Sequence, residues 1–151
     1  MTYLFIYGLM KRGESCHNLL PIEELTYIGE GILSKIRPLI IASKYNYPFL
    51  LDTTSRGLHV KGEIYIINND SVLSKLDKLE HHPELNERKL CSVLSALGNQ
   101  KIFECWTYLL TDFKGEYIGY PCLEEYYNGR LNKYANVLNY NENILDEVKH
   151  I

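Results

Sequence analysis

Apolar residues alternate with polar ones along most of the chain, in short runs separated by turn residues. Such alternation predicts strands with one buried face, because successive side chains of a strand point to opposite faces. The sequence predicts strands over residues 3–7, 25–33, 39–42, 48–51, 59–67, 88–97 and 101–110. Glycines at positions 29 and 31 predict a bend or bulge. Gly98-Asn99 predicts that the last two strands form a hairpin.

Helical periodicity is strongest over residues 71–80. Its apolar stripe consists of Val72, Leu73, Leu76 and Leu79, at the spacing of an amphipathic helix. Asn69 or Asp70 is the expected cap, and Pro83 argues against continuation. Shorter helices are predicted at residues 16–20 and 123–127, the second within an otherwise irregular tail. One long helix among many strands argues against a doubly wound parallel sheet. We therefore predict an α+β fold, a small mixed domain with a curled or barrel-like β-sheet.

Glu80 is the most informative position in this pattern. At about 100° per residue, it falls inside the apolar stripe, whereas Asp77 and Lys78 fall on the opposite face. Burying a carboxylate is costly unless it is paired or neutral. Either Glu80 ends the helix and reaches water or Arg88, or its raised proton affinity serves a reaction. The helix alone leaves both interpretations open.

Composition narrows the class of protein. The 151 residues fit one domain, residues 1–151, and the net charge of -3 gives no basic footprint for nucleic acid. No segment approaches the roughly 20 apolar residues that span a membrane. The N-terminal run lacks the features of a signal peptide, so we expect a cytoplasmic protein. We also expect it to be a monomer or a weak dimer.

The four cysteines are spread along the chain as Cys16, Cys91, Cys105 and Cys122. None forms a C-x-x-C pair, which argues against a zinc site or a thioredoxin-like motif. Cys91 and Cys105 lie in strand-like runs and are expected to be core residues with free thiols. Nothing in the sequence favours a cysteine nucleophile.

A loop bracketed by glycines, Gly8 to Gly13, follows the first predicted strand. Glycine allows close approach of a ligand, and successive backbone N–H groups can hold a carboxylate. The order of residues is not that of a P-loop. Taken alone, this loop is either a turn or a binding loop.

Taken together, several short motifs form an ordered set. They are Tyr7-Gly8 after a strand, Val60-x-Gly62-Glu63-x-Tyr65, Leu76-Asp77-x-x-Glu80, and Pro83 followed by Arg88. This order and spacing resembles the γ-glutamylcyclotransferase family over roughly residues 3 to 110. The middle of the chain is most similar to members that act on γ-glutamyl amines.

The resemblance implies a small mixed fold around a curled sheet, without metal or organic cofactor. It implies a small-molecule substrate whose γ-glutamyl group is cyclised to 5-oxoproline with release of an amine, such as lysine from γ-glutamyl-ε-lysine. The family's catalytic glutamate falls on Glu80, and its substrate-holding loop falls on Tyr7, Gly8, Leu9 and Met10.

Elementary chemistry agrees with these assignments. The substrate's α-amine, with a pKa of about 8, must lose a proton before it attacks the γ-carbonyl. A carboxylate with raised proton affinity can take that proton and pass it to the leaving amine. The loop from Gly8 to Met10 is the expected source of N–H donors to the developing oxyanion.

Three positions depart from the family pattern. Leu9 replaces a threonine, Asn86 replaces a tyrosine two residues before the arginine, and His81 follows the glutamate where a small residue is usual. These departures keep open a non-catalytic binding protein, or a cyclotransferase for γ-glutamyl-amino acids or glutathione.

Other polar residues have two interpretations each. Arg88 either binds a substrate carboxylate or pairs with Glu80 or Glu84. His81 and His82 are expected at a polar helix end rather than as metal ligands, and Glu63 is expected to face water. Tyrosines of the tail either close over the site or pack as core residues; they are Tyr117, Tyr120, Tyr126 and Tyr127.

Overall fold

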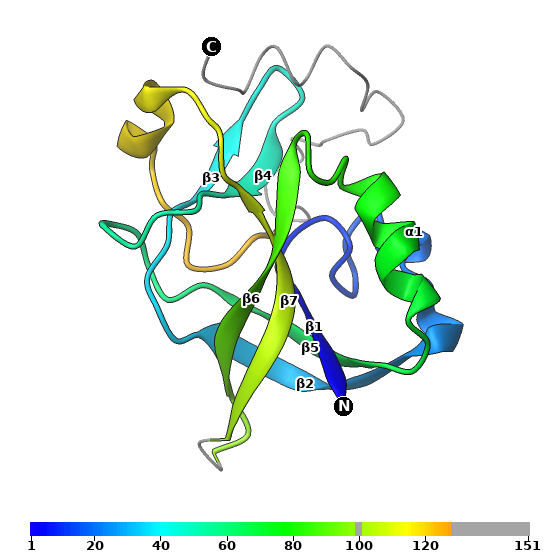
Figure 1. Cartoon of the computed structure of the whole chain (residues 1–151). Coiled ribbons are helices and arrows are strands. Elements are labelled where there is room, and N and C mark those ends of the chain that lie inside the picture. The colour runs from blue at the N-terminus through cyan, green and yellow to red at the C-terminus, as the bar shows by residue number, and fades with distance from the viewer. Residues whose placement is uncertain (99–100, 128–151) are drawn as a thin grey trace.

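The computed structural model describes residues 1–98 and 101–127. Strands and helices follow one another along this part of the chain (Figure 1). The strands are β1 (Thr2–Ile6), β2 (Leu25–Leu33), β3 (Leu39–Ala42), β4 (Tyr47–Leu50), β5 (Lys61–Ile67), β6 (Asn86–Ser95) and β7 (Ile102–Leu110). The helices are α1 (Ser71–Leu79) and the 3-10 turns η1 (His17–Leu19), η2 (Ile22–Glu24) and η3 (Gly115–Gly119).

Five strands close into a barrel in the order β1-β5-β2-β6-β7. All neighbouring pairs are antiparallel except β1 and β7, which close the barrel in parallel. β3 and β4 form a separate two-stranded sheet, which lies at one end of the barrel (Figure 1). In the same view β6 and β7 cross each other at the front of the barrel. The predicted α+β fold with a barrel-like sheet is confirmed.

The alternating pattern places side chains on the two faces of the barrel wall. On β1, Phe5 joins a core cluster with Ile64 and Val93, which fills the barrel. Leu4 and Ile6 point the other way, into a second cluster that contains Val72 and Leu76 of α1. The period of two along β1 thus provides one face for the barrel interior and one for the helix.

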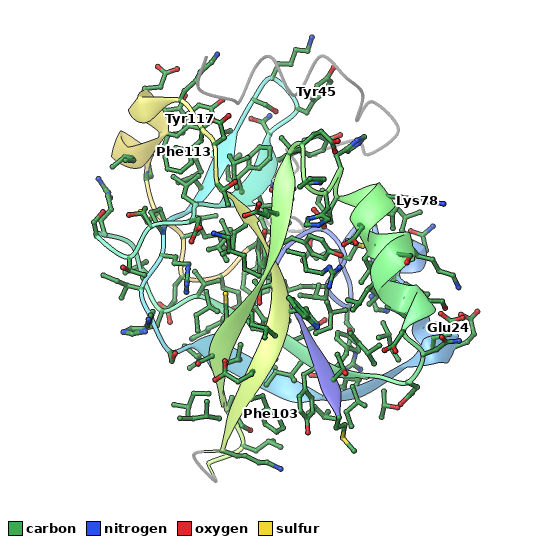
Figure 2. All side chains as sticks on the ribbon, in the orientation of Figure 1. Glu24, Tyr45, Lys78, Phe103, Phe113 and Tyr117 are labelled. Carbon is green, nitrogen blue, oxygen red and sulfur yellow. The ribbon has the colours of Figure 1, made fainter. Side chains whose placement is uncertain are left out.

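α1 presents the predicted apolar stripe to the barrel, with Val72 and Leu76 fully buried. Lys78 points away from the body of the molecule (Figure 2). Asp70 occupies the cap position without a side-chain bond, and Asn69 Oδ1 accepts the Ser71 N–H at 3.0 Å instead. The helix ends at Leu79 with Glu80 as its C-cap, and His81 follows with a left-handed φ of 53°.

Most predicted strands are confirmed within two residues. The bounds of β2 are as predicted, and its register shifts between Tyr27 and Gly29, which confirms the bulge. β6 begins and ends two residues earlier than the predicted 88–97. Part of the predicted hairpin turn, from Asn99, lies outside the described residues.

Two predictions for the other segments need correction. The predicted helix at residues 16–20 is only the 3-10 turn η1. The predicted helix at residues 123–127 is absent, and the helical turn of this region is η3. Residues 123 and 124 instead bond to two strands. Leu123 N–H donates to Leu39 O of β3 at 2.8 Å, and Lys61 N–H of the barrel strand β5 donates to Glu124 O at 2.8 Å.

Two of the four tyrosines of the tail, Tyr117 and Tyr126, are buried in the core, whereas Tyr120 is partly buried and Tyr127 is exposed. Tyr117 lies beside Phe113 near η3 (Figure 2) and belongs to the cluster around β3 and β4. Tyr126 is buried in the barrel cluster. The packing interpretation is therefore confirmed for these two.

In residues 1–98 and 101–127, no helix has the length and apolar character needed to cross a membrane.

Candidate active site

A cavity of about 680 Å³, counted to its open mouth, lies where the end of β1 meets the end of α1. Its lining residues are Phe5, Ile6, Tyr7, Gly8, Leu9, Met10, Cys16, Leu19, Tyr47, Pro48, Phe49, Leu79, Glu80, Asn86 and Tyr108. The structure thus brings together five of the six residues predicted for the site, all except Arg88.

Glu80 is half-buried, and its accessible part faces this cavity. Its backbone N–H closes the last turn of α1 on Leu76 O at 2.8 Å, which fixes its position at the helix end. Burial raises the pKa of its carboxyl from 4.5 to about 7, and a hydrogen bond from Asn86 partly opposes that rise. A carboxyl with this pKa can accept and release a proton near neutral pH.

The hydrogen bond to Glu80 comes from the first residue of β6. Asn86 Nδ2 donates to Glu80 Oε2 at 2.9 Å, and the Asn86 side chain is buried with 4% of the residue exposed. Asn86 was predicted only as a departure from the family pattern. Its role as a partner of Glu80 was missed, because the sequence does not show how residues 81–85 return the chain to the helix end.

The loop after β1 lines the same cavity with Gly8, Leu9 and Met10. Within residues 1–98 and 101–127, the backbone N–H groups of Gly8, Leu9 and Met10 find no hydrogen-bond acceptor in the protein. The loop is nevertheless held, since Lys11 N–H donates to Gly8 O at 3.1 Å and Cys16 N–H donates to Leu9 O at 3.0 Å. A Cβ on Gly8 would lie 3.1 Å from Pro48 Cγ, so glycine allows the two walls to approach closely.

Two tyrosines complete the polar part of the lining. Tyr7 Oη donates to the backbone oxygen of Tyr108 at 2.6 Å. Burial, followed by the nearby charge of Glu80, raises the pKa of Tyr7 well above its ordinary value. Both hydroxyls stay neutral near pH 7, because burial also raises the pKa of Tyr108. Of these three lining groups, Glu80 is therefore the one whose pKa lies near neutrality.

Comparison with known proteins assigns the chain to a family. The model of the family described as "Gamma-glutamyl cyclotransferase, AIG2-like" matches residues 4–128. The chain belongs to this gamma-glutamyl cyclotransferase family. The resemblance found in the sequence motifs is confirmed.

Curated members of the family are similar in sequence to this chain along most of their length. A Drosophila melanogaster protein, named as a candidate gamma-glutamylcyclotransferase, is 34% identical over 128 residues, which are 83% of this chain and 80% of the relative. The gamma-glutamylaminecyclotransferase of Rattus norvegicus is 29% identical over 134 residues, covering 83% and 89%. The crystal structure of an AIG2-like protein from Mus musculus has a TM-score of 0.82 at 28% identity, covering 90% of this chain and 95% of that one.

Arg88 lies outside the cavity lining in this family member. Its guanidinium donates to both oxygens of Asp77, with Nε to Oδ1 at 2.9 Å and Nη2 to Oδ2 at 3.1 Å, and it stacks over Trp106. The described ion pair of Arg88 is therefore with Asp77, and the predicted pairing with Glu80 or Glu84 is wrong.

The prediction that Asp77 lies on the polar face of the helix, away from the apolar stripe, also needs correction. Asp77 is half-buried and is turned toward the sheet rather than toward water. Tyr108 Oη donates to its Oδ1 at 2.7 Å. Burial would raise the pKa of Asp77, but hydrogen bonds from Arg88 and Tyr108 outweigh that effect and lower it. Tyr108 thus links the Asp77 pair to the cavity wall.

The remaining polar candidates have local structural contacts. His82 Nδ1 accepts the Arg88 N–H at 3.0 Å. Glu63 Oε1 accepts the Arg12 N–H at 2.9 Å and the Tyr65 hydroxyl at 3.0 Å. In the part of the chain that the structure describes, no group of three His, Cys, Asp or Glu residues could hold a metal ion.

Proposed function

We propose that this protein is a γ-glutamylamine cyclotransferase. It would cyclise the γ-glutamyl group of a γ-glutamyl amide, such as γ-glutamyl-ε-lysine, to 5-oxoproline and release the amine. The observation that carries the proposal is the Glu80 carboxyl, with a pKa of about 7, in a cavity that is also lined by Gly8, Leu9 and Met10. Family membership and similarity to named gamma-glutamylaminecyclotransferases support it.

In this mechanism Glu80 is the general base and then the general acid. The ionised carboxylate takes a proton from the substrate's α-ammonium group, whose pKa is about 8. The neutral nitrogen then attacks the γ-carbonyl carbon of the same molecule. Nucleophile and carbonyl are already joined, so ring closure has the advantage of proximity.

The new carbon–nitrogen bond gives a tetrahedral intermediate with a negative oxygen. Backbone N–H groups of the loop at residues 8–10 are suited to stabilise that oxygen and to hold the substrate's α-carboxylate. Both tasks use backbone atoms, so Leu9 can occupy a position where the family usually has threonine. Protonated Glu80 then gives its proton to the leaving nitrogen as the original amide bond breaks. The ionised Glu80 takes the second proton from the ring nitrogen and passes it to the released amine, so 5-oxoproline keeps one N–H and the amine leaves as its ammonium.

The rest of the lining favours an amine with an aliphatic arm as the leaving group. Apolar and aromatic side chains dominate the wall, among them Leu19, Pro48 and Phe49. Among the described lining residues, none is Lys, Arg or His. A γ-glutamyl-α-amino acid would place a carboxylate one carbon from the leaving nitrogen, and glutathione would place one at its glycine end. Neither carboxylate would have a cationic partner among the described lining residues. The four methylenes of a lysine arm would instead contact the apolar wall and carry the charged groups outward.

Product analysis tests the proposal. Purified protein is incubated with γ-glutamyl-ε-lysine, and 5-oxoproline and lysine are followed by mass spectrometry. γ-Glutamyl-alanine and glutathione are compared under the same conditions. We expect equal amounts of both products from the isopeptide, and a kcat/KM at least tenfold lower for the other two substrates.

Glu80→Gln is the matched variant, because it keeps size and hydrogen-bonding shape but removes the base. Release of products by wild type and not by the variant supports the assigned role. Equal release by both would remove Glu80 as the base. No release from any of the three substrates would favour a protein that binds a ligand without turnover.

A further inference from the structure

The connection between α1 and β6 is folded tightly around Glu80. Asn86 N–H donates to Glu80 O at 3.3 Å, and Leu85 N–H donates to His81 O at 2.8 Å. His82 N–H also donates back to Asp77 O at 2.8 Å. Residues 80 and 86 are therefore held together by backbone as well as by side chain.

β6 fixes the position of Asn86 from the other side. Asn86 pairs with Leu110 of β7 in the barrel register, so its side chain is carried by a strand rather than by a loose loop. Its amide has little freedom, because the residue is 4% exposed. The amide nitrogen then meets only one of the two carboxylate oxygens of Glu80, Oε2.

We propose that Asn86 is the positioning residue for Glu80, which holds Oε2 and leaves Oε1 as the oxygen that exchanges protons with the substrate. This inference rests on the proposed cyclotransferase function. Within the described residues, Oε1 of Glu80 has no hydrogen-bond partner, and Glu80 lines the cavity. An amide that carries no charge can orient a carboxylate without the strong pKa depression that a cationic partner causes.

Asn86 also limits how far burial raises the proton affinity of Glu80. Its N–H bond favours the ionised form, so it opposes the desolvation that dominates at this carboxyl. The other titratable groups near Glu80 are Tyr7 and Tyr108 of the cavity wall, Cys16 of the lining, Asp77 of α1 with its partner Arg88, and the neighbouring His81 and His82. Asn86 is the described group that donates a hydrogen bond to the Glu80 carboxylate.

The test replaces the amide in two ways. Asn86→Leu has similar volume and no donor, and Asn86→Asp has the same shape with a second carboxyl. In both variants the ionised form of Glu80 loses its donor, so the acid limb of kcat/KM moves to higher pH. A hydrogen bond to a charged group is worth about 1.5–3 kcal/mol, which corresponds to a shift of roughly one to two pH units. The shift should be larger for Asn86→Asp, because two carboxyls then share the site.

Ser92→Ala is the matched control, since Ser92 lies on the same strand and its hydroxyl bonds Glu104 on the neighbouring strand. We expect its pH profile to match wild type. A merely structural role for Asn86 predicts lower activity or melting temperature with the acid limb unmoved in both variants, and this would overturn the proposal.

A second readout separates this inference from the proposed function. The ¹³C NMR signal of the Glu80 side-chain carboxyl is titrated in wild type and Asn86→Leu, without substrate. A higher midpoint in the variant supports the positioning role even if no γ-glutamyl substrate is turned over. An identical midpoint in folded protein would overturn it, whatever the enzyme assay shows.

Discussion

Asp77 and Glu80 are two carboxylates at one end of the same helix, and their surroundings oppose each other. Asp77 lies between α1 and the sheet, where a guanidinium and a tyrosine hydroxyl donate to it and lower its pKa. Glu80 faces the cavity with one neutral amide donor, and burial raises its pKa to about 7. A carboxylate that stays charged thus lies only three positions along the helix from one that can exchange a proton near neutral pH.

The difference comes from the partners that each side chain receives from distant parts of the chain. A cation beside a carboxylate stabilises its charged form, whereas burial without a cation favours the neutral form. The Asp77 region is thus suited to hold α1 on the barrel, and the Glu80 region is suited to acid–base chemistry.

The largest expected effect is on turnover. Glu80→Gln should lower kcat/KM for γ-glutamyl-ε-lysine by about 10²–10⁴-fold, the usual contribution of a general acid–base group. Asp77→Asn should stay within about tenfold of wild type, because Asp77 does not line the cavity. Steady-state kinetics on both variants measures the contrast, and similar losses in the two would contradict it.

Glu80→Gln should lower turnover but raise the free energy of unfolding above neutral pH. Its carboxyl has a pKa of about 7 in the folded protein against 4.5 ordinarily. Between these two pKa values the folded protein keeps Glu80 protonated whereas the unfolded chain does not. The free energy of unfolding therefore falls as pH rises from about 4.5 through 7. At about 1.4 kcal/mol per pKa unit, Glu80→Gln should exceed wild type by about 3 kcal/mol at pH 8 and by little below pH 4.5. Urea unfolding at pH 4.5, 6 and 8 checks this, and a constant difference would argue against the raised pKa.

Asp77 should show the reverse dependence. Its folded pKa lies below the ordinary 3.8, so its contribution is present above that value and is lost as pH falls further. Asp77→Asn should cost roughly 1–3 kcal/mol at pH 7, as expected for lost hydrogen bonds to charged groups. A double-mutant cycle with Arg88→Gln should show coupling between the two positions. A large rise in KM for Arg88→Gln without loss of stability would instead assign Arg88 to substrate.

The smallest effect is expected in the loop. Leu9 is half-buried and packs against all three core clusters. Leu9→Thr should cost about 1 kcal/mol of stability through lost apolar burial, and should change KM less than about threefold because the proposed contacts use backbone N–H groups. A tenfold fall in KM would show that the missing hydroxyl matters for substrate binding.

The sequence was sufficient for the features that depend on local pattern. The bounds of β2 followed from alternation and its glycines, and the inward position of Glu80 followed from helical periodicity. The partners of the two carboxylates could not be predicted, because they come from other elements. Asp77 was assigned to the exposed face because periodicity within α1 contains no information on Arg88 or Tyr108, which are 11 and 31 residues away.

The most direct test of this account is a ¹³C NMR titration of the side-chain carboxyls in the wild-type protein, with Glu80→Gln and Asp77→Asn used to assign the signals. We predict a midpoint near pH 7 for Glu80 and a midpoint below the ordinary value of 3.8 for Asp77. A Glu80 midpoint near 4.5 would contradict the account, because the described lining of the cavity would then contain no carboxyl able to exchange protons near neutral pH.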